Sequence, residues 1–243
     1  MELMQASPFA PYIEETGDGT DRYAALIKSA FSKAVQENTE LPEWILRLHG
    51  MSGRRYRIFI NQLVKTIDDA KYLEVGSWAG STACSAIYGN KVYCSCIDNW
   101  SEFGGPKDQF HRNVKAAISP DGINGLRCYE EDFRAVDYRT IGKSNVYLFD
   151  GPHSTQDQYD GLKFPLPALE DVFILIVDDW NDPRPREGTH KAIEELGIEV
   201  VYSMQIRTSN GIDRIYPEIV SQHSHWHNGY FISVCKKPTT VKV

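Results

Sequence analysis

The stretch Lys71–Trp100, KYLEVGSWAGSTACSAIYGNKVYCSCIDNW, decides the fold of this 243-residue chain. A short apolar run meets a turn bounded by Gly76 and Gly80, and small residues after the turn begin a helix. A second apolar run then ends at Asp98. This order predicts a β-α-β unit whose glycine turn lets the backbone approach a ligand at the helix N-terminus. Asp98 stands where a carboxylate can accept hydrogen bonds from a ribose diol.

The bulk composition narrows the class of protein. The chain has 33 acidic and 26 basic side chains and a net charge of −7, so no basic field attracts nucleic acid or an anionic membrane. No apolar run approaches the roughly 20 residues of a membrane span, and no signal peptide is visible. The five cysteines form no C-x-x-C pair, which predicts neither a disulfide framework nor a zinc site. We expect a cytoplasmic protein, and the sequence leaves its oligomeric state open.

Helical and strand patterns continue on both sides of the opening stretch. Residues 1–19 are expected to form an irregular arm. Three helices are expected before the first strand, either as a cap over the site or packed on the sheet edge, so that residues 1–68 precede a catalytic domain at 69–243. Later strands are expected at 126–129, 144–149, 173–177, 198–205 and 230–235. The prediction is a doubly wound α/β sheet of seven strands, mostly parallel, with the last strand antiparallel.

Carboxylates follow the strands of this predicted sheet. Asp98, Asp132 and Asp150 stand at or just after strand ends, and so does the pair Asp178-Asp179. Because the carboxyl ends of parallel strands share one edge, we expect these side chains to gather on one rim. Three of them crowded together are costly unless they are protonated or bind a cation. Oxygen ligands suit Mg²⁺ or Ca²⁺ better than zinc.

The order of these motifs resembles the class I S-adenosylmethionine-dependent methyltransferases over about residues 70–236. The residues that match are an E-x-G-x-x-x-G-S turn at 74–81, then Asp98, then the turn Glu131-Asp132-Phe133. Residues 150–159 begin DGPHS and end in tyrosine, similar to the D-G-x-H-x-Y segment of the small-molecule O-methyltransferase branch. Asp178-Asp179-Trp180 is similar to the acid pair of the macrocin-type sugar O-methyltransferases.

The resemblance implies S-adenosylmethionine (SAM) as the cofactor and a set of residues that bind it. The set is Glu74, Gly76, Ser77, Gly80, Ser81, Asp98, Asn99, Trp100, Asp132, Phe133 and Asp150. The glycine turn would hold the methionine part, with Glu74 behind it, and Asp98 would bind the ribose hydroxyls. Asn99 and Trp100 would flank the adenine, whose amino group would donate to Asp132. From the residues alone, Asp132 is equally suited to a local cap, and Trp100 to a place in the core.

The resemblance also implies a metal site. In the macrocin-type branch, the acids corresponding to Asp150, Asp178 and Asp179 hold Mg²⁺, which would lower the pKa of the acceptor hydroxyl and orient its oxygen. Asp150 or His153 would collect the proton. The residues alone also allow Asp179 to cap the next segment and His153 to be a turn histidine. The loop after Trp180 departs from the branch, since NDPRPREG replaces a glycine-rich run. Residues 181–185 are expected to form a proline-rich loop before a helix at about 186–196.

The expected function is therefore a SAM-dependent O-methyltransferase, assisted by Mg²⁺, that acts on a hydroxylated small molecule such as a sugar or secondary metabolite. Two alternatives stay open. One is a nicotinamide-dependent oxidoreductase in which Asp98 binds the ribose of NAD, and the other is a non-catalytic module whose acidic rim serves binding or oligomer contacts. Specificity for the acceptor is expected from the N-terminal helices and from residues 208–229. Three histidines there, at 223, 225 and 227, suit a solvated loop better than a metal site.

Overall fold

The computed structural model describes residues 11–118, 122–208 and 225–238. The strands are β1 (Tyr12–Gly17), β2 (Ala70–Val75), β3 (Val92–Ile97), β4 (Gly125–Tyr129), β5 (Ser144–Phe149), β6 (Leu169–Val177), β7 (Glu199–Arg207) and β8 (Tyr230–Lys236). The α-helices are α1 (Arg22–Val35), α2 (Glu43–Leu46), α3 (Arg54–Thr66), α4 (Ser81–Ile87), α5 (Lys107–Ala117), α6 (Thr155–Lys163) and α7 (Pro183–Glu195). None of these helices has the length and apolar character needed to span a bilayer.

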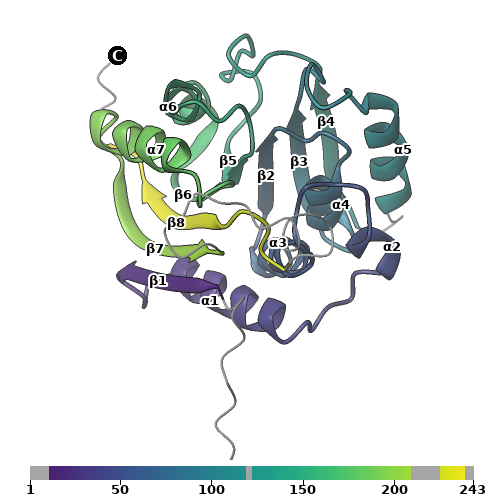
Figure 1. Cartoon of the computed structure of the whole chain (residues 1–243), viewed down its shortest axis with the longest axis horizontal. Coiled ribbons are helices and arrows are strands. Elements are labelled where there is room, and N and C mark those ends of the chain that lie inside the picture. The colour runs from purple at the N-terminus through teal and green to yellow at the C-terminus, as the bar shows by residue number, and fades with distance from the viewer. Residues whose placement is uncertain (1–10, 119–121, 209–224, 239–243) are drawn as a thin grey trace, which may run out of the picture.

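One sheet runs through the described part of the chain in the order β1-β7-β8-β6-β5-β2-β3-β4 (Figure 1). The five strands from β6 to β4 are parallel to one another, and β8 is antiparallel to both of its neighbours. This confirms the predicted doubly wound, mostly parallel sheet with a reversed last strand. The five cysteines are unbonded, also as predicted.

The strand count is eight rather than seven, because residues 12–17 are not the irregular arm that the sequence predicted. They pair antiparallel with β7 as an edge strand. Side chains add to the ladder, since Tyr202 donates to Glu15 (2.9 Å) and the hydroxyls of Thr16 and Ser203 lie 2.9 Å apart. The strand is exposed along nearly its whole length, so it carries no alternation of apolar and polar residues by which the sequence could reveal it.

Helix α7 also begins earlier than predicted. Residues 181–185 were expected to form a proline-rich loop, but Pro183 is the first helical residue and the side chain of Asp182 caps it by accepting from the N–H of Arg184 (2.9 Å). Proline is compatible with this position because the first N–H groups of a helix have no partner inside the helix.

Alternate residues of the strands build two hydrophobic clusters on opposite faces of the sheet. In β6, Ile174 and Ile176 face one cluster, to which α1–α5 contribute, and Leu175 and Val177 face the other, which includes residues of α6 and α7. The N-terminal helices therefore pack on one face of the sheet, and the division of the chain at residues 68/69 stays a prediction.

Backbone hydrogen bonds place the ends of the parallel strands in a row. The N–H of Gly76 donates to Ile97 (2.9 Å), that of Asp150 to Val75 (2.9 Å) and that of Asp178 to Phe149 (3.2 Å). The residues that follow β2, β5 and β6 therefore lie side by side on one edge. The predicted gathering of acids on a single rim is correct, and this rim carries the candidate site.

Candidate active site

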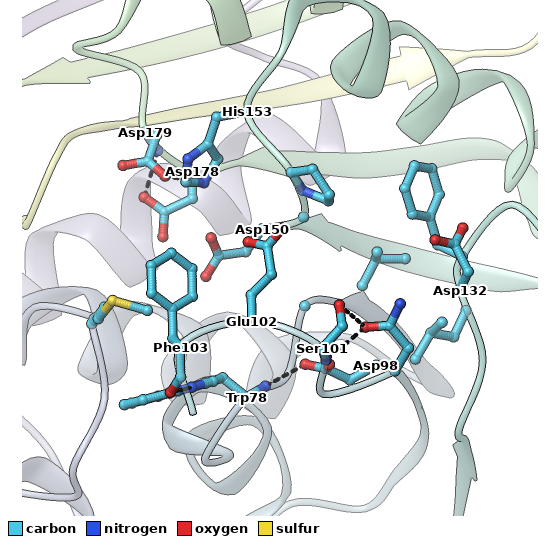
Figure 2. Close-up of a pocket in the computed structure, with 18 of the residues that line it drawn as sticks. Trp78, Asp98, Ser101, Glu102, Phe103, Asp132, Asp150, His153, Asp178 and Asp179 are labelled. Atoms are coloured by element: carbon cyan, nitrogen blue, oxygen red, sulfur yellow. Dashed lines mark hydrogen bonds and ion pairs between the residues drawn. The ribbon is translucent and has the colours of Figure 1, made fainter. Parts of the chain in front are cut away.

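A pocket opens on this edge, and nine of the predicted site residues line it. They are Gly76, Asp98, Asn99, Asp132, Phe133, Asp150, His153, Asp178 and Asp179. Five other predicted residues do not line it, namely Glu74, Ser77, Gly80, Ser81 and Trp100. Figure 2 shows Asp98 and Asp132 toward one end of the pocket and His153, Asp178 and Asp179 toward the other. We call these the cofactor end and the transfer end.

The glycine turn at the cofactor end depends on a backbone that other residues rarely adopt. Gly76 has φ +86°, and a Cβ there would overlap the carbonyl oxygen of Asp150. Gly80 has φ +87° and caps α4, and its N–H donates to Ser77 (2.7 Å) to close the turn. Glycine at both positions is thus required by the path of the chain.

Asp98 joins the glycine turn to the loop that follows β3. Its Oδ2 accepts from the N–H of Trp78 (2.7 Å) and its Oδ1 from the N–H of Trp100 (2.6 Å). A carboxylate has about four lone-pair positions, so each oxygen can accept one further hydrogen bond from a ligand in the pocket. The ring of Trp100 instead packs against Phe110 (5.3 Å between centroids), and its Nε1 donates to the Trp78 carbonyl (2.9 Å). Trp100 therefore stabilises the glycine turn and does not line the pocket.

Three more predicted residues lie beneath the turn. Glu74 is fully buried and accepts from the hydroxyl of Tyr72 (2.6 Å). Burial raises the pKa of Glu74, and the hydrogen bond from Tyr72 opposes that shift. Ser77 is itself buried. Ser81 faces the N-terminal segment, with its hydroxyl 2.8 Å from that of Ser52. These side chains support the turn and do not reach the pocket.

Asp132 caps its own turn and also lines the pocket. Its Oδ1 accepts from the N–H of Arg134 (2.8 Å), which is a local cap, and the residue also lines the pocket. The next residue, Phe133, adds an apolar wall and packs edge-on against Phe149 (5.4 Å between centroids).

The transfer end contains a compact group of two carboxylates and an imidazole. Ligand atoms of Asp150, His153 and Asp179 lie within 4.8 Å of one another, and His153 Nε2 lies 2.8 Å from Asp179 Oδ2. The hydrogen bond to Asp179 raises the pKa of His153 to about 9. Burial and the charge of Asp179 raise the pKa of Asp150 well above its ordinary value.

The composition of this group differs from the predicted set of metal ligands by one residue. The expected metal ligands were Asp150, Asp178 and Asp179, but within the described residues the group that converges holds His153 in place of Asp178. Asp178 is 3% exposed, and its Oδ1 accepts from the N–H of Asp179 (2.6 Å). Asp179 has a left-handed backbone (φ +57°), which takes its carboxylate out of the strand register and toward His153.

The turn before β8 contributes residues that sequence reasoning missed. Asn228 donates its Nδ2 to Asp179 Oδ1 (2.6 Å), and both Asn228 and His227 line the pocket. His225 instead faces Glu37, with 3.9 Å between its Nδ1 and the Oε1 of Glu37. His223 is outside the described residues. The histidine run marked the segment in the sequence, but nothing local indicated that it folds back onto Asp179.

Other missed residues come from three separate loops. Met51 precedes α3, Trp78 lies in the glycine turn, and Glu102 and Phe103 lie in the loop between β3 and α5. Figure 2 shows the side chains of Glu102 and Phe103 pointing into the pocket from that loop. Their sequence neighbourhood predicts only a loop.

Comparison with known proteins identifies the fold. No family model matches the chain, and no curated protein matches it significantly in sequence. An O-methyltransferase from Bacillus cereus in complex with S-adenosylhomocysteine (SAH) is 14% identical to this chain. Its TM-score is 0.51, and the match covers 87% of this chain and 91% of that one. TomG from Streptomyces achromogenes, an O-methyltransferase involved in tomaymycin synthesis and solved with SAM, is 13% identical, with a TM-score of 0.51 over 89% and 90%. The fold is that of the class I methyltransferases.

A third structure has the same fold in a longer protein. TrmN from Thermus thermophilus is 14% identical, with a TM-score of 0.50 over 86% of this chain. The match covers 52% of TrmN, so this chain spans about half the length of that protein. At these identities the likeness extends to the fold, and the chemistry has to be argued from the pocket.

Proposed function

We propose that the protein is a SAM-dependent O-methyltransferase that acts on a hydroxylated small molecule with the help of a divalent cation, Mg²⁺ in the first place. One observation carries this proposal. A single pocket joins the glycine turn and Asp98 to the group of Asp150, His153 and Asp179. A methyl donor at one end and a hydroxyl acceptor at the other would thus meet inside one cavity.

The cofactor end has the chemistry that SAM requires. Asp98 offers unused lone pairs to a pair of ribose hydroxyls, and Asp132 offers a carboxylate to the adenine amino group. Ile97 and Phe133 supply apolar surface for the adenine ring. All the polar groups named here accept hydrogen bonds, and the ribose and the adenine amino group donate them.

The transfer end fits a divalent cation. Two carboxylates and an imidazole converge. Burial and the charge of Asp179 raise the pKa of Asp150, although the charge of His153 opposes that shift. The carboxylate oxygens of Asp150 and Asp179 suit Mg²⁺ or Mn²⁺, which would leave the imidazole of His153 available as a base. A bound cation would supply Lewis acidity, which lowers the pKa of an acceptor hydroxyl.

His153 is the proposed proton acceptor, and Asp179 is the residue that orients it. Because the ion pair with Asp179 raises the pKa of His153 to about 9, the imidazole holds a proton at neutral pH in the free protein. It can act as a base once that proton leaves, either at higher pH or when a cation takes its place beside Asp179. Asp150, on the same wall, is the second candidate for this role.

Calorimetric titration with S-adenosylhomocysteine (SAH) tests the proposal. We expect binding in the micromolar range and no response to NADH in a parallel fluorescence titration. Binding of NADH in place of SAH would favour the dinucleotide alternative. The absence of SAH binding at high micromolar concentration would overturn the proposed function.

A further inference from the structure

Most of the charged side chains around the pocket are acidic. Among the described residues, seven carboxylates line it and no lysine or arginine does. The seven are Asp98, Glu102, Glu131, Asp132, Asp150, Asp178 and Asp179. The imidazole of His153 also lines the pocket, but it is paired with Asp179. An anionic ligand would therefore meet mostly repulsion here, whereas a ligand with a positive charge would be attracted.

Glu102 is the carboxylate that the proposed reaction leaves unused. It is exposed, and within the described part of the chain no ion pair includes it. Its backbone is held in the loop, where its carbonyl accepts from the N–H of Gly105 (3.0 Å). Its side chain points into the pocket (Figure 2). A carboxylate directed at other carboxylates calls for a positively charged group between them.

Asn228 supplies an independent indication of a ligand. It is 8% exposed and lines the pocket, and its Nδ2 is already bonded to Asp179 (2.6 Å). Its Oδ1 is buried and has no hydrogen-bond partner among the described residues. A buried acceptor without a donor is costly, so a hydroxyl or ammonium group of a bound molecule would stabilise it.

Two apolar side chains flank these acceptors. Phe103 is 62% exposed and Met51 is 42% exposed, and both line the pocket. Large apolar side chains left open beside a polar cavity favour a ligand with a flat or ring-shaped apolar face. The pocket thus combines hydrogen-bond acceptors, negative charge and an apolar platform.

We infer that the methyl acceptor is a hydroxylated ring compound that carries an amine and no acidic group. The inference rests on the proposed methyltransferase function. The ammonium group pairs with Glu102, a hydroxyl or N–H donates to Asn228 Oδ1, and the ring lies on Phe103. The acceptor hydroxyl faces the group of Asp150, His153 and Asp179.

A set of three sugars that differ in charge tests this inference. Glucosamine, glucose and glucuronate are titrated at neutral pH into the protein saturated with SAH, and binding is followed by saturation-transfer NMR. We expect glucosamine to bind about threefold to fivefold more tightly than glucose, as a partly exposed ion pair allows, and glucuronate to bind most weakly. Equal affinities, no binding of glucosamine, or a preference for glucuronate would each overturn the inference.

Variants assign the preference to a residue. Glu102→Gln is expected to remove the advantage of glucosamine over glucose while leaving the affinities for glucose and SAH unchanged. Asp108→Asn, which removes an exposed carboxylate of α5 outside the lining, should leave the advantage intact. If Glu102→Gln lowers SAH affinity instead, Glu102 serves the cofactor and the inference is wrong. SAH binding is measured separately, so the two proposals can fail independently. An absence of SAH binding would contradict the methyltransferase proposal. SAH binding without a preference for glucosamine would contradict only the inference that the acceptor carries an amine.

Discussion

The two ends of the pocket hold their carboxylates in different ways. At the cofactor end, backbone N–H groups satisfy Asp98 and Asp132, and the donor to Asp132 is only two residues away. At the transfer end, Asp150, Asp178 and Asp179 crowd one another, and the partners of Asp179 are the side chains of His153 and Asn228. At the cofactor end, each of the two carboxylates already has a backbone hydrogen-bond donor. The transfer end instead holds like charges that a cation would stabilise. The variants below test this difference.

The largest effect is expected when a ligand is removed from the transfer end. Asp179→Asn keeps the shape of the side chain but loses the charge that pairs with His153. We expect affinity for Mn²⁺, measured by electron paramagnetic resonance, to fall by about 100-fold or more, and SAH affinity to change little. Asp182→Asn is the matched control, because this acid caps α7 outside the pocket lining. If Asp179→Asn and the parent protein bind Mn²⁺ equally well, Asp179 is not a metal ligand.

The reverse result is expected at the cofactor end. Asp98→Ala should lower SAH affinity by roughly 100-fold, because it deletes two hydrogen bonds between hydroxyls and a charged group, while Mn²⁺ affinity stays close to that of the parent. Asp98→Asn should lose less, since its amide keeps one oxygen that can accept from Trp78 or Trp100. Calorimetry measures both affinities. A parallel loss of Mn²⁺ binding would mean that the two ends are not independent.

A third variant changes Gly76, which belongs to the glycine turn and lies against the backbone of Asp150 at the transfer end. Gly76→Ala forces a left-handed backbone on alanine and drives its Cβ into the carbonyl oxygen of Asp150, so we expect a loss of about 3 kcal/mol in the free energy of unfolding. Gly89→Ala has a similar backbone (φ +67°) but open space around the Cβ, and should cost about 1 kcal/mol. Urea unfolding compares the two. Equal losses would show that the contact with Asp150 carries no strain.

The smallest expected effect is a dependence of stability on pH that comes from the transfer end. Burial and neighbouring carboxylates raise the pKa of Asp150 and Asp178 well above the ordinary value in the folded protein. Stability from their protonated forms is therefore present at low pH and is lost as pH rises through the raised values. The raised pKa of His153 also stabilises the folded protein at lower pH, and this contribution is lost as pH rises through about 9.

Without added metal, we expect the melting temperature to fall by a few degrees between about pH 5 and about pH 8. Mg²⁺ should restore it at the upper end of that range, and Asp178→Asn should flatten the profile. A melting temperature that rises over this range, with or without Mg²⁺, would contradict the assignment of buried, uncompensated carboxylates to this end of the pocket.

Much of the cofactor end could be predicted because its contacts are local. The glycine turn, Asp98 and the turn at Asp132 each lie within or just after one strand, and parallel strands necessarily bring their ends to one edge. Of the two residues expected to flank the adenine, Asn99 lines the pocket, whereas the ring of Trp100 packs on Phe110 instead. A residue's place along the chain predicts which edge it reaches but not the direction of its side chain.

The transfer end could be predicted only in part. Asp150, Asp178 and Asp179 lie on one rim because β5 and β6 are parallel and their carboxyl ends share one edge of the sheet. The exchange of Asp178 for His153 depends on the left-handed backbone of Asp179, which no local pattern indicated.

The sequence by itself thus determined the sheet, its reversed last strand and the edge on which the acids gather, because hydrophobic periodicity and turn residues act over a few positions. It could not reveal β1, whose exposed strand is held by pairing with β7. Nor could it place Asn228 beside Asp179, 49 positions away, or direct Glu102 into the pocket. Those features required the folded chain, because they depend on contacts between segments that lie close together only in space.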